Sequence, residues 1–530
     1  MATLALPARP APMDRSEVYQ YRYVIAFAVV LASVLELVDT SIVNVAIPHM
    51  MGSLGATLEE IAWVSTGYIV ANVIILPLTG WLSDRFGRRN YYTGSIILFT
   101  AASFLCGNAH SLEWLVSARV LQGIGGGALI STAQAILFDV FPMHERGKAM
   151  AIFGMGVMVG PTLGPTLGGW ITDNYSWPWI FYINIPLGIL AAIMTWRYVP
   201  EPAHEVNGRT PVDWIGLGLL IMGIGALQIL LERGEAHDWF DSREIVVEAI
   251  IAGVAIIAFI WHELVTEHPV VDLRILKNRQ LFAGTAFGLV LGFGLYASVF
   301  ALPVFLQTDL GYSAWDTGLV ILPGAIASAI TMAIVGRLSN RVDNRLMIFL
   351  GVLLFMYAMW LHYHFTLDIG MHDLFWPMIF RGVGLGLIFV PLSQLAAADL
   401  KSSQLAQGTG LFNLSRQLGG SFGIAVAATL LTRFAEQGRE ALRAHLEAGD
   451  AVTRGWMASV TSGMMSSSGS IGEAQGKALA VLDFTLRRQA SVVSFEKVFL
   501  VMGIAFIFTM PLLLLFKKGR MVKAGGMGGH

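Results

Sequence analysis

The first long apolar stretch of the chain contains two carboxylates. Glu36 and Asp39 are three residues apart, so on a helix they share one face. A charge inside a bilayer costs several kcal/mol unless it faces a cavity or a partner. A carboxyl that is partly removed from water can instead bind and release a proton near neutral pH. The acids could also be structural or lie at the membrane surface, but the pattern favours a proton-coupling site built on Asp39, with Glu36 as a second candidate.

Arginines in the later apolar stretches could pair with these acids. Arg119 keeps its proton, so it cannot carry one, but it can pair with a carboxylate and compete with a cation for it. The alternative is an arginine whose long side chain reaches the membrane surface. Arg381 and Arg416 are interpreted as packing or gating residues, and Arg416 is also a candidate for a substrate pocket. Asp139, in the same stretch as Arg119, is interpreted as interfacial.

Other kinds of chemistry find no support in the sequence. The chain lacks a Gly-x-x-x-x-Gly-Lys-Ser/Thr phosphate loop, the Cys/His spacings of a metal site and a nucleophile elbow. Its single cysteine, Cys106, cannot form an intrachain disulfide, and a net charge of −2 does not suggest nucleic acid as a partner. We therefore expect no enzymatic activity, no cofactor, no metal and no use of ATP; the remaining energy source, a proton gradient, is what the resemblance described below implies.

The composition places these groups in a membrane. Only 13% of the 530 residues are charged and 55% are hydrophobic, whereas a soluble protein has about 25% charged residues. A helix needs about 20 mostly apolar residues to cross a bilayer, and the sequence contains fourteen such stretches. They are 24–47, 62–82, 91–109, 114–140, 149–172, 178–198, 213–231, 245–265, 282–306, 315–336, 346–366, 374–396, 407–431 and 498–516. The sequence therefore predicts an all-α membrane protein.

The distribution of Lys and Arg orients these spans. With the N-terminus inside, the short inner loops carry fourteen of these residues and the short outer loops carry two, Arg233 and Arg243. Short loops rich in Lys and Arg stay on the cytoplasmic side. Both termini are therefore expected in the cytoplasm, as an N-terminal tail of residues 1–23, in which we find no signal peptide, and a C-terminal tail of residues 517–530.

A repeated segment divides the spans into two sets. The sequence GWLSDRFGRR at 80–89 returns 256 positions later as GRLSNRVDNR at 336–345, and ten of the thirty-six paired residues from 54 to 89 are identical. A repeat of this length indicates duplicated structural units. It predicts two six-helix bundles, residues 24–198 and 282–516. Residues 199–281 are then a linker with two inserted transmembrane helices.

The first copy of this segment could act as a gate. Its glycines permit a tight turn and close helix approach, and its acid can cap a helix or pair with the arginines. The gating residues are Gly80, Asp84, Arg85, Gly87, Arg88 and Arg89. Because Asn340 and Asp343 replace the acid and the second glycine in the other copy, an ionic latch would act on one half only. The alternative is an anchor that fixes the topology.

Glycines recur every four residues in the predicted span 149–172. Small residues at this spacing let two helix backbones approach closely in lipid. Two prolines in the same stretch each remove a backbone donor and are expected to kink the helix. The residues are Gly156, Gly160, Pro161, Gly164, Pro165, Gly168 and Gly169. We expect a close-packed helix at a moving domain interface, and a static packing motif is the alternative.

The segment 432–497 differs from the other predicted loops. It is about 65 residues long and lies outside, with a Ser/Gly-rich part at 459–472. The mixed-charge stretches 433–446 and 477–488 on either side are typical of amphipathic helices. A loop of this length is usually functional or disordered. We therefore interpret it as a long periplasmic loop.

Several motifs together resemble one family of transporters. They are LVDTSIVNVAIP at 37–48, the segment 80–89, RVLQGIGGG at 119–127 and GVMVGPTLGPTLGG at 156–169. With them, nearly the whole chain resembles the major facilitator superfamily. The sequence LQILLERG at 227–234 makes it similar to the fourteen-span drug:proton antiporters of the EmrB type. The resemblance implies that the spans of Asp39 and Arg119 are neighbours and that the glycine motif marks exporters, whereas Glu36 lies outside the family motif.

The resemblance also implies a function. It implies a multi-pass protein of the bacterial inner membrane that exports lipophilic or amphipathic compounds by alternating access, in exchange for protons. A periplasmic membrane-fusion adaptor would dock on the segment 432–497 and connect to an outer-membrane channel. A proton-coupled exporter of one specific solute, such as a siderophore, fatty acid or secondary metabolite, is the alternative. A non-transporting membrane sensor is a third hypothesis, against which the acid in the first span and the glycine motif argue.

Mostly aromatic residues are the candidates for the substrate path. Aromatic rings suit lipophilic cations through stacking and cation–π contacts. The alternative is that rings at helical spacing face lipid or the core. The candidate pocket residues are Asn44, Trp63, Tyr68, Tyr182, Phe293, Tyr296, Phe412 and Arg416.

Overall fold

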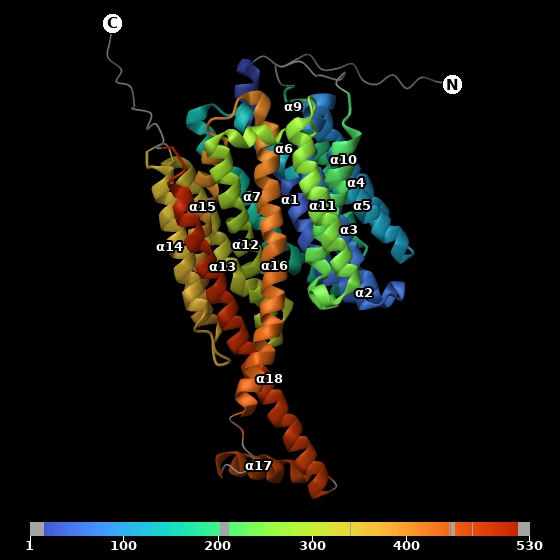
Figure 1. Cartoon of the computed structure of the whole chain (residues 1–530), viewed down its shortest axis with the longest axis vertical. Helices are drawn as coiled ribbons and strands as arrows, with labels where there is room; N and C mark the ends of the chain where they lie inside the picture. Colours follow the sequence, from blue (N-terminus) through green and yellow to red (C-terminus); the bar gives the residue numbers. More distant parts are fainter. Residues whose placement is uncertain are drawn as a thin grey trace.

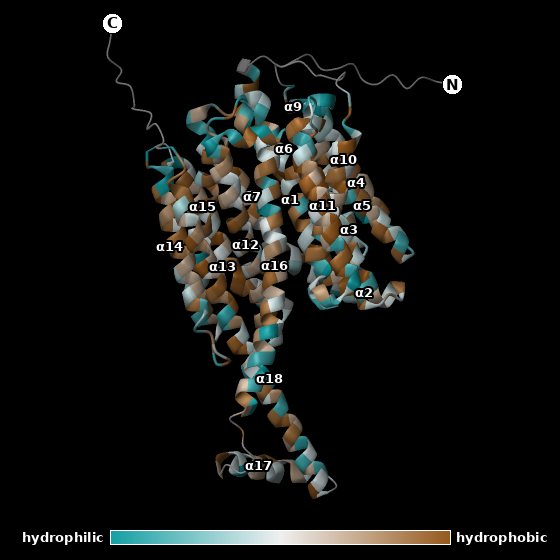
Figure 2. Cartoon of the chain, in the orientation of Figure 1, coloured by the Kyte–Doolittle hydropathy of each residue, from teal (hydrophilic) through white to brown (hydrophobic). Residues whose placement is uncertain are grey.

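The regular structure of the described residues is helical throughout. The computed structural model describes residues 15–201, 211–339, 341–444, 446, 451–468 and 470–517. Within these ranges, thirteen helices are long and apolar enough to cross a membrane. Hydrophobic residues dominate the middle of the bundle, and hydrophilic residues gather toward its ends (Figure 2). This distribution suits a protein whose lateral surface contacts lipid.

The N-terminal half begins with a long helix, α1, at Arg15–Leu54. The following elements are α2 (Leu58–Ile61), α3 (Trp63–Phe86), α4 (Arg88–Gly107), α5 (Leu112–Gly126), α6 (Leu129–Val140), η1 (Met143–Glu145), α7 (Arg146–Asn174), α8 (Trp179–Tyr182) and α9 (Asn184–Tyr198). Local sequence sets several of these boundaries. Thr57 and Glu60 form a capping box at α2, and Ser111 caps α5. Gly87 separates α3 from α4 with a φ of 83°, which glycine adopts readily.

Two inserted helices lie beside both halves. They are α10 (Trp214–Arg233) and α11 (Arg243–Val265), joined through η2 (Glu235–His237) and η3 (Trp239–Asp241). Arg233 of α10 forms an ion pair of 3.0 Å with Glu59 of the N-terminal half. Gln228 donates to the Ser421 hydroxyl, in the C-terminal half, at 2.9 Å. The insertion therefore contacts the two halves at once.

The C-terminal half contains a helix, α16, that is as long as α1. Its elements are η4 (Leu273–Lys277), α12 (Arg279–Thr308), α13 (Ala314–Leu338), α14 (Asn344–His362), α15 (Met371–Ala397), η5 (Ser402–Gln404), α16 (Leu405–Ala444), α17 (Ala451–Met464), η6 (Met465–Ser467), α18 (Ile471–Ala505), η7 (Phe506–Thr509) and α19 (Met510–Leu513). Helix α19 and the beginning of α1 lie at the same end of the bundle (Figure 1). We call this end of the bundle the basic end, because the arginine-rich turn between α3 and α4 lies there.

The predicted span 91–109 corresponds to α4, which is helical but is not among the thirteen apolar helices. Its first turn contains Arg88, Arg89 and Asn90, and these residues lower its mean hydropathy. The remainder is apolar, and Phe99 and Cys106 are fully buried. With α4, the described chain has a helix at each of the fourteen predicted spans.

Two predicted boundaries are wrong. The expected tail 1–23 is already helical from Arg15, because Arg22 pairs with Glu145 at 3.2 Å and covers the Tyr19 ring at 3.7 Å. The segment 432–497, predicted as a long loop with amphipathic helices at 433–446 and 477–488, has those helices but is helical over most of its described length. It continues α16 and α18 as a helical hairpin that projects from the end opposite the basic end, with α17 lying across its tip (Figure 1). We call residues 432–497 the helical extension, of which 445, 447–450 and 469 lie outside the described residues.

Contacts between α16 and α18 explain why the helical extension is ordered where it is described. Ser494 donates to the Leu431 carbonyl at 2.6 Å, close to the bundle. Farther out, Arg439 pairs with Asp483 at 2.5 Å. Polar pairs of this kind replace the apolar contacts that hold helices together elsewhere, so no hydropathy signal marks these helical turns.

Candidate functional site

Asp39 and Arg119 form a buried ion pair in the N-terminal half. Arg119 Nη1 of α5 donates to Asp39 Oδ2 of α1 at 2.5 Å, and the two side chains are 1% and 0% exposed. Two amides donate to the other carboxylate oxygen, Oδ1. They are Nε2 of Gln122 and Nδ2 of Asn184, each at 2.8 Å. Asp39 therefore accepts three hydrogen bonds from two helices, α5 and α9.

A second layer holds the arginine in place. Arg119 Nε donates to the Val64 carbonyl at 3.1 Å, and its Nη1 also donates to Gln122 Oε1 at 2.7 Å. The guanidinium lies 4.0 Å from the centre of the Tyr68 ring. Removing one member of a buried, hydrogen-bonded ion pair leaves an uncompensated charge, which costs about 3–5 kcal/mol. A proton that neutralises Asp39 would impose such a change on α1, α5 and α9 together.

Glu36 lies one turn from Asp39 but belongs to a different contact network. Its Oε1 accepts from Asn72 Nδ2 of α3 at 2.8 Å. Its Oε2 is buried and has no hydrogen-bond partner among the described residues, as is also true of the Tyr68 hydroxyl. The two acids are therefore not equivalent: Asp39 is saturated with donors and paired, whereas half of the Glu36 carboxyl lacks a partner. Sequence spacing alone could not separate them.

The glycine motif of α7 packs against α1. A Cβ atom added at Gly156 would collide with Val30, at Gly160 with Leu37, and at Gly164 with Ser41. The Ser41 hydroxyl also donates to the Gly160 carbonyl at 3.2 Å. These contacts lie inside one half, so the glycines supply the close packing expected of this helix but do not themselves face the other half.

The other surface of α7 does reach the opposite half. Gly147 lies against Gly336 and Ser339 of α13, and the Phe153 ring stacks on Phe389 of α15 with centroids 6.3 Å apart. The helix is continuous from Arg146 to Asn174, through both prolines, so the expected kink does not interrupt it. Pro165 is half-buried, and the side chain of Pro161 lies outside the described residues.

The gating segment connects the two halves at the basic end. Arg88 Nη1 pairs with Asp139 Oδ2 of α6 at 2.9 Å. The Ser402 hydroxyl, in the opposite half, donates to Asp139 Oδ1 at 2.6 Å. Asp139 thus bridges the halves, a role that its interpretation as an interfacial residue missed. Its partner Ser402 could not be identified from the sequence, because 263 positions separate them.

The remaining residues of this segment have several partners. A Cβ added at Gly80 would lie 2.8 Å from Gln407 Cβ of α16, so this glycine permits a close approach between the halves. Arg89 lies 3.7 Å from Glu201, near Gly87. Asp84 and Arg85 lie in the last turn of α3, with Arg85 over the Trp81 ring at 5.5 Å. In the second copy, Asp343 caps α14, while Asn340 lies outside the described residues.

Further contacts seal the interface between α6 and α16. The Thr409 hydroxyl donates to the Ser131 carbonyl at 3.0 Å. One turn farther along α16, Asn413 Nδ2 donates to Gln134 Oε1 at 2.7 Å. Together with Asp139 and Ser402, these bonds form a continuous line of cross-half contacts that begins at the basic end. The structure is therefore closed at this end.

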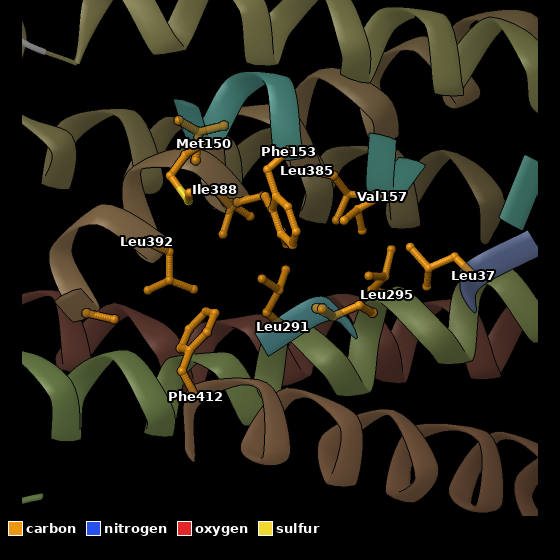
Figure 3. Close-up of a cluster of buried hydrophobic side chains, with 14 of the residues drawn as sticks. Leu37, Met150, Phe153, Val157, Leu291, Leu295, Leu385, Ile388, Leu392 and Phe412 are labelled. Carbon is orange, nitrogen blue, oxygen red and sulfur yellow. The ribbon is translucent and has the colours of Figure 1, made fainter. Parts of the chain in front are cut away.

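An apolar cluster occupies the centre of the interface. Figure 3 shows side chains from α1, α7, α12, α15 and α16 converging on one space. The labelled residues are Leu37, Met150, Phe153, Val157, Leu291, Leu295, Leu385, Ile388, Leu392 and Phe412. All of them are buried and most are less than 5% exposed. We call this group the central apolar cluster.

The predicted pocket residues do not form one group. Phe412 belongs to the central apolar cluster, and Tyr296 accepts a hydrogen bond from Arg416 at 3.0 Å. Phe293 is half-buried where α12 meets α16. The other four lie in the N-terminal half. Tyr68 covers Arg119, Tyr182 donates to the Gly107 carbonyl, Trp63 stacks under Arg233, and Asn44 is exposed near Ser65.

Comparison with known proteins identifies the family. The family model of the Major Facilitator Superfamily matches residues 29–424. The fatty acid resistance protein FarB of Neisseria gonorrhoeae is 38% identical over 503 residues, which cover 94% of this chain and 96% of that protein. The multidrug export protein EmrB of Escherichia coli K12 is 38% identical over 413 residues, or 77% of this chain and 80% of that protein.

Solved structures share the fold at low identity. The human organic anion transporter MFSD10 is 14% identical with a TM-score of 0.57, covering 92% of this chain and 99% of that one. The proton:xylose symporter XylE is 13% identical with a TM-score of 0.56, covering 93% and 96%. The expected fold class, an all-helical membrane protein of the major facilitator type, is confirmed. The chain is a member of the major facilitator superfamily.

Proposed function

We propose that this protein is a proton-driven exporter of lipophilic or amphipathic compounds in the bacterial inner membrane, with its basic end in the cytoplasm. The observation that carries the proposal is the buried Asp39–Arg119 pair, with three donors on a single carboxylate. A buried acid in a membrane helix is expensive and calls for a functional reason. Relatives named as a multidrug export protein and a fatty acid resistance protein support export rather than uptake.

Protonation of Asp39 is the coupling step. A proton on this carboxyl removes the negative charge that Arg119 faces and converts an acceptor into a donor. Gln122 and Asn184 then lose the charged acceptor that they share. Because the glycines of α7 hold α1 tightly, a shift of α1 moves α7 as well, and α7 contacts α13 and α15 of the other half. Proton binding is thereby linked to the interface between the halves.

The energy available suits one or two protons per cycle. Moving one charge down a potential of 100 mV yields about 2.3 kcal/mol, and each pH unit adds about 1.4 kcal/mol. Each 1.4 kcal/mol corresponds to about a tenfold concentration ratio. A single proton can therefore sustain a substrate gradient of tenfold or more.

A test of the coupling assignment uses inverted membrane vesicles with an imposed pH gradient. Asp39→Asn keeps the hydrogen-bonding shape but cannot be ionised, so we expect gradient-driven uptake of a fluorescent lipophilic cation to be lost. Glu267→Gln, an equivalent change at an exposed acid near the basic end, should leave the uptake intact. Gradient-driven transport by Asp39→Asn at the original rate would show that the coupling group lies elsewhere.

The helical extension is the proposed dock for a periplasmic adaptor protein and, through it, an outer-membrane channel. It projects from the end opposite the basic end (Figure 1). It exposes large apolar side chains outside the main bundle, including Trp456, Leu479 and Phe484. Exposed apolar groups rimmed by charges are typical of protein interaction sites. A direct test is co-purification of the adaptor with the intact chain and with variants of these three residues.

Export of one specific solute, a long-chain fatty acid, is the second candidate function. It is favoured by the similarity to FarB, which covers 94% of this chain. A substrate panel in a host without its own pumps distinguishes the candidates. A broad exporter moves cationic, neutral and anionic amphiphiles, whereas a dedicated carrier moves one class. Ligand binding without flux in any vesicle would instead support a non-transporting sensor.

A further inference from the structure

Arg416 of α16 is a buried cation without a carboxylate partner. Its side chain is 2% exposed. Nη1 donates to the Tyr296 hydroxyl at 3.0 Å and Nη2 to Asn413 Oδ1 at 3.3 Å, whereas Nε has no partner. Among the described residues, no carboxylate lies within 4.0 Å of it. Arg119, in the other half, is equally buried but has Asp39.

The guanidinium of Arg416 lacks a negatively charged partner. Arginine remains charged in proteins, and burying an uncompensated charge is costly unless a counter-ion is supplied. Glu36 of α1, in the opposite half, is also buried. It makes no contact with Arg416, and its own carboxylate is held by Asn72. The site around Arg416 therefore suits an anion that arrives from outside the protein.

The surroundings of Arg416 define the rest of that ligand. Phe412 precedes it by four residues on α16, so the two side chains share one face of the helix. Phe412 belongs to the central apolar cluster, together with Leu291 and Leu295 of α12 (Figure 3). Tyr296, the hydrogen-bond partner of Arg416, is the residue after Leu295. A charged group and an extended apolar surface thus lie next to each other at the interface.

We propose that Arg416 is the head-group anchor for anionic amphiphiles, chiefly long-chain carboxylates, whose hydrocarbon tails occupy the central apolar cluster when the halves separate. The proposal rests on the proposed export function and identifies a specificity residue within it. Two N–H groups of the guanidinium can donate parallel hydrogen bonds to the two oxygens of a carboxylate.

Binding to the purified full-length protein tests this assignment without requiring transport. The probe is a fluorescent long-chain carboxylate, displaced by oleate. We expect Arg416→Met to weaken oleate binding by about tenfold or more, and Arg416→Lys to restore much of it, because a lysine keeps the charge but not the planar fork. The matched control is Arg381→Met. This arginine of α15 is also buried in the C-terminal half, but among the described residues it has no hydrogen bond to Tyr296 or Asn413, so oleate binding should persist.

Transport of two substrates distinguishes a binding role from a packing role. In vesicles, Arg416→Met should lose oleate export while export of tetraphenylphosphonium continues. An equal loss of both, or unchanged oleate binding, overturns the assignment, and so does an equal loss in Arg381→Met. If the wild-type protein binds oleate through Arg416 but exports neither compound, the proposed export function fails while the anion site stands.

Lipid composition separates the two possible sources of the anion. In bilayers of phosphatidylcholine alone, a free carboxylate has no anionic competitor. If added phosphatidylglycerol weakens oleate binding to the wild type but not the residual binding of Arg416→Met, the site also accepts phospholipid head groups. If it has no effect, the site is selective for the free acid. Both results support an anion site at Arg416. Oleate binding that is independent of Arg416 in both bilayers excludes it.

Discussion

At the scale of single residues, the N-terminal half separates two acids that the sequence places together. Asp39 accepts three hydrogen bonds and pairs with Arg119, whereas Glu36 has one donor and a free oxygen. In the first arrangement, protonation of the carboxylate would remove its negative charge and disturb its ion pair and hydrogen bonds. The second leaves a carboxyl group oriented by Asn72. In the proposed mechanism, Asp39 is therefore the proton-coupling residue.

Arg119→Lys tests whether this coupling depends on geometry as well as charge. Arg119 uses Nη1 for Asp39 and Gln122 and Nε for the Val64 carbonyl. A lysine ammonium is a compact point charge and cannot reproduce this fork. We expect gradient-driven efflux to fall by about tenfold or more, equivalent to about 1.4 kcal/mol. Exchange of substrate without a pH gradient should continue. Full gradient-driven activity in this variant would mean that charge alone suffices.

At the scale of elements, the packing of α1 on α7 connects Asp39 to the interface between the two halves. The glycines of α7 face Val30, Leu37 and Ser41 of α1, and Asp39 lies between the last two. Close backbone contact leaves little room for either helix to move alone. In the proposed mechanism, a displacement of α1 on protonation would therefore move α7, which contacts α13 and α15 of the other half.

Gly164→Ala and Gly169→Ala provide a matched test of this packing. A Cβ at Gly164 would overlap the Ser41 hydroxyl, whereas a Cβ at Gly169 meets only Val45 Cγ1 at 3.9 Å. Overpacking of this kind destabilises by about 1–3 kcal/mol. We expect Gly164→Ala to lower the thermal unfolding temperature in detergent and to slow export, with Gly169→Ala close to the wild type. Equal effects of the two substitutions would argue against tight α1–α7 packing.

Much of this architecture could be predicted, and the exceptions share a cause. The lengths of the apolar stretches alone predicted where the helices lie, because a helix needs a long apolar stretch to cross a bilayer. The mixed-charge stretches 433–446 and 477–488 predicted the helices of the extension, but not that α16 and α18 continue into it as a hairpin, held by pairs such as Arg439 and Asp483. The Asp139–Ser402 contact was missed because it joins distant parts of the chain. The direction of the glycine face depends on helix packing, which spacing does not specify.

At the scale of the whole molecule, the structure shows one state of a cycle that requires two. The halves are joined at the basic end by Asp139 and Ser402, by Thr409 and Ser131, and by Asn413 and Gln134. A carrier that loads substrate from this end must break these bonds. Because these hydrogen bonds are few, they can stabilise the closed state and still break when the end opens.

Asp139→Asn should shift the molecule away from this closed state. The change removes the charge that holds Arg88 and weakens the acceptor for Ser402. We expect faster maleimide labelling, from the basic end, of a cysteine placed at Gln407 in a Cys106→Ser background. Asp343→Asn is the matched control, because Asp343 caps α14 and pairs with Arg345 within its own half. Unchanged labelling in Asp139→Asn would show that the apolar contacts alone keep this end closed.

If the helical extension docks an adaptor protein, as proposed, its removal should affect delivery to the outer membrane but not transport. Gly438 of α16 lies against Ala490 of α18, so a short turn from Gly438 to Arg488 can close the truncated hairpin. Arg488 keeps its bonds to the Asp309 carbonyl, which anchor α18 to the turn between α12 and α13. The transport core is then intact. We expect flux in inverted vesicles to match the wild type, whereas resistance of whole cells is lost because no adaptor can dock. Loss of vesicle flux would place the helical extension in the transport core, and unchanged cell resistance would exclude it as the docking site.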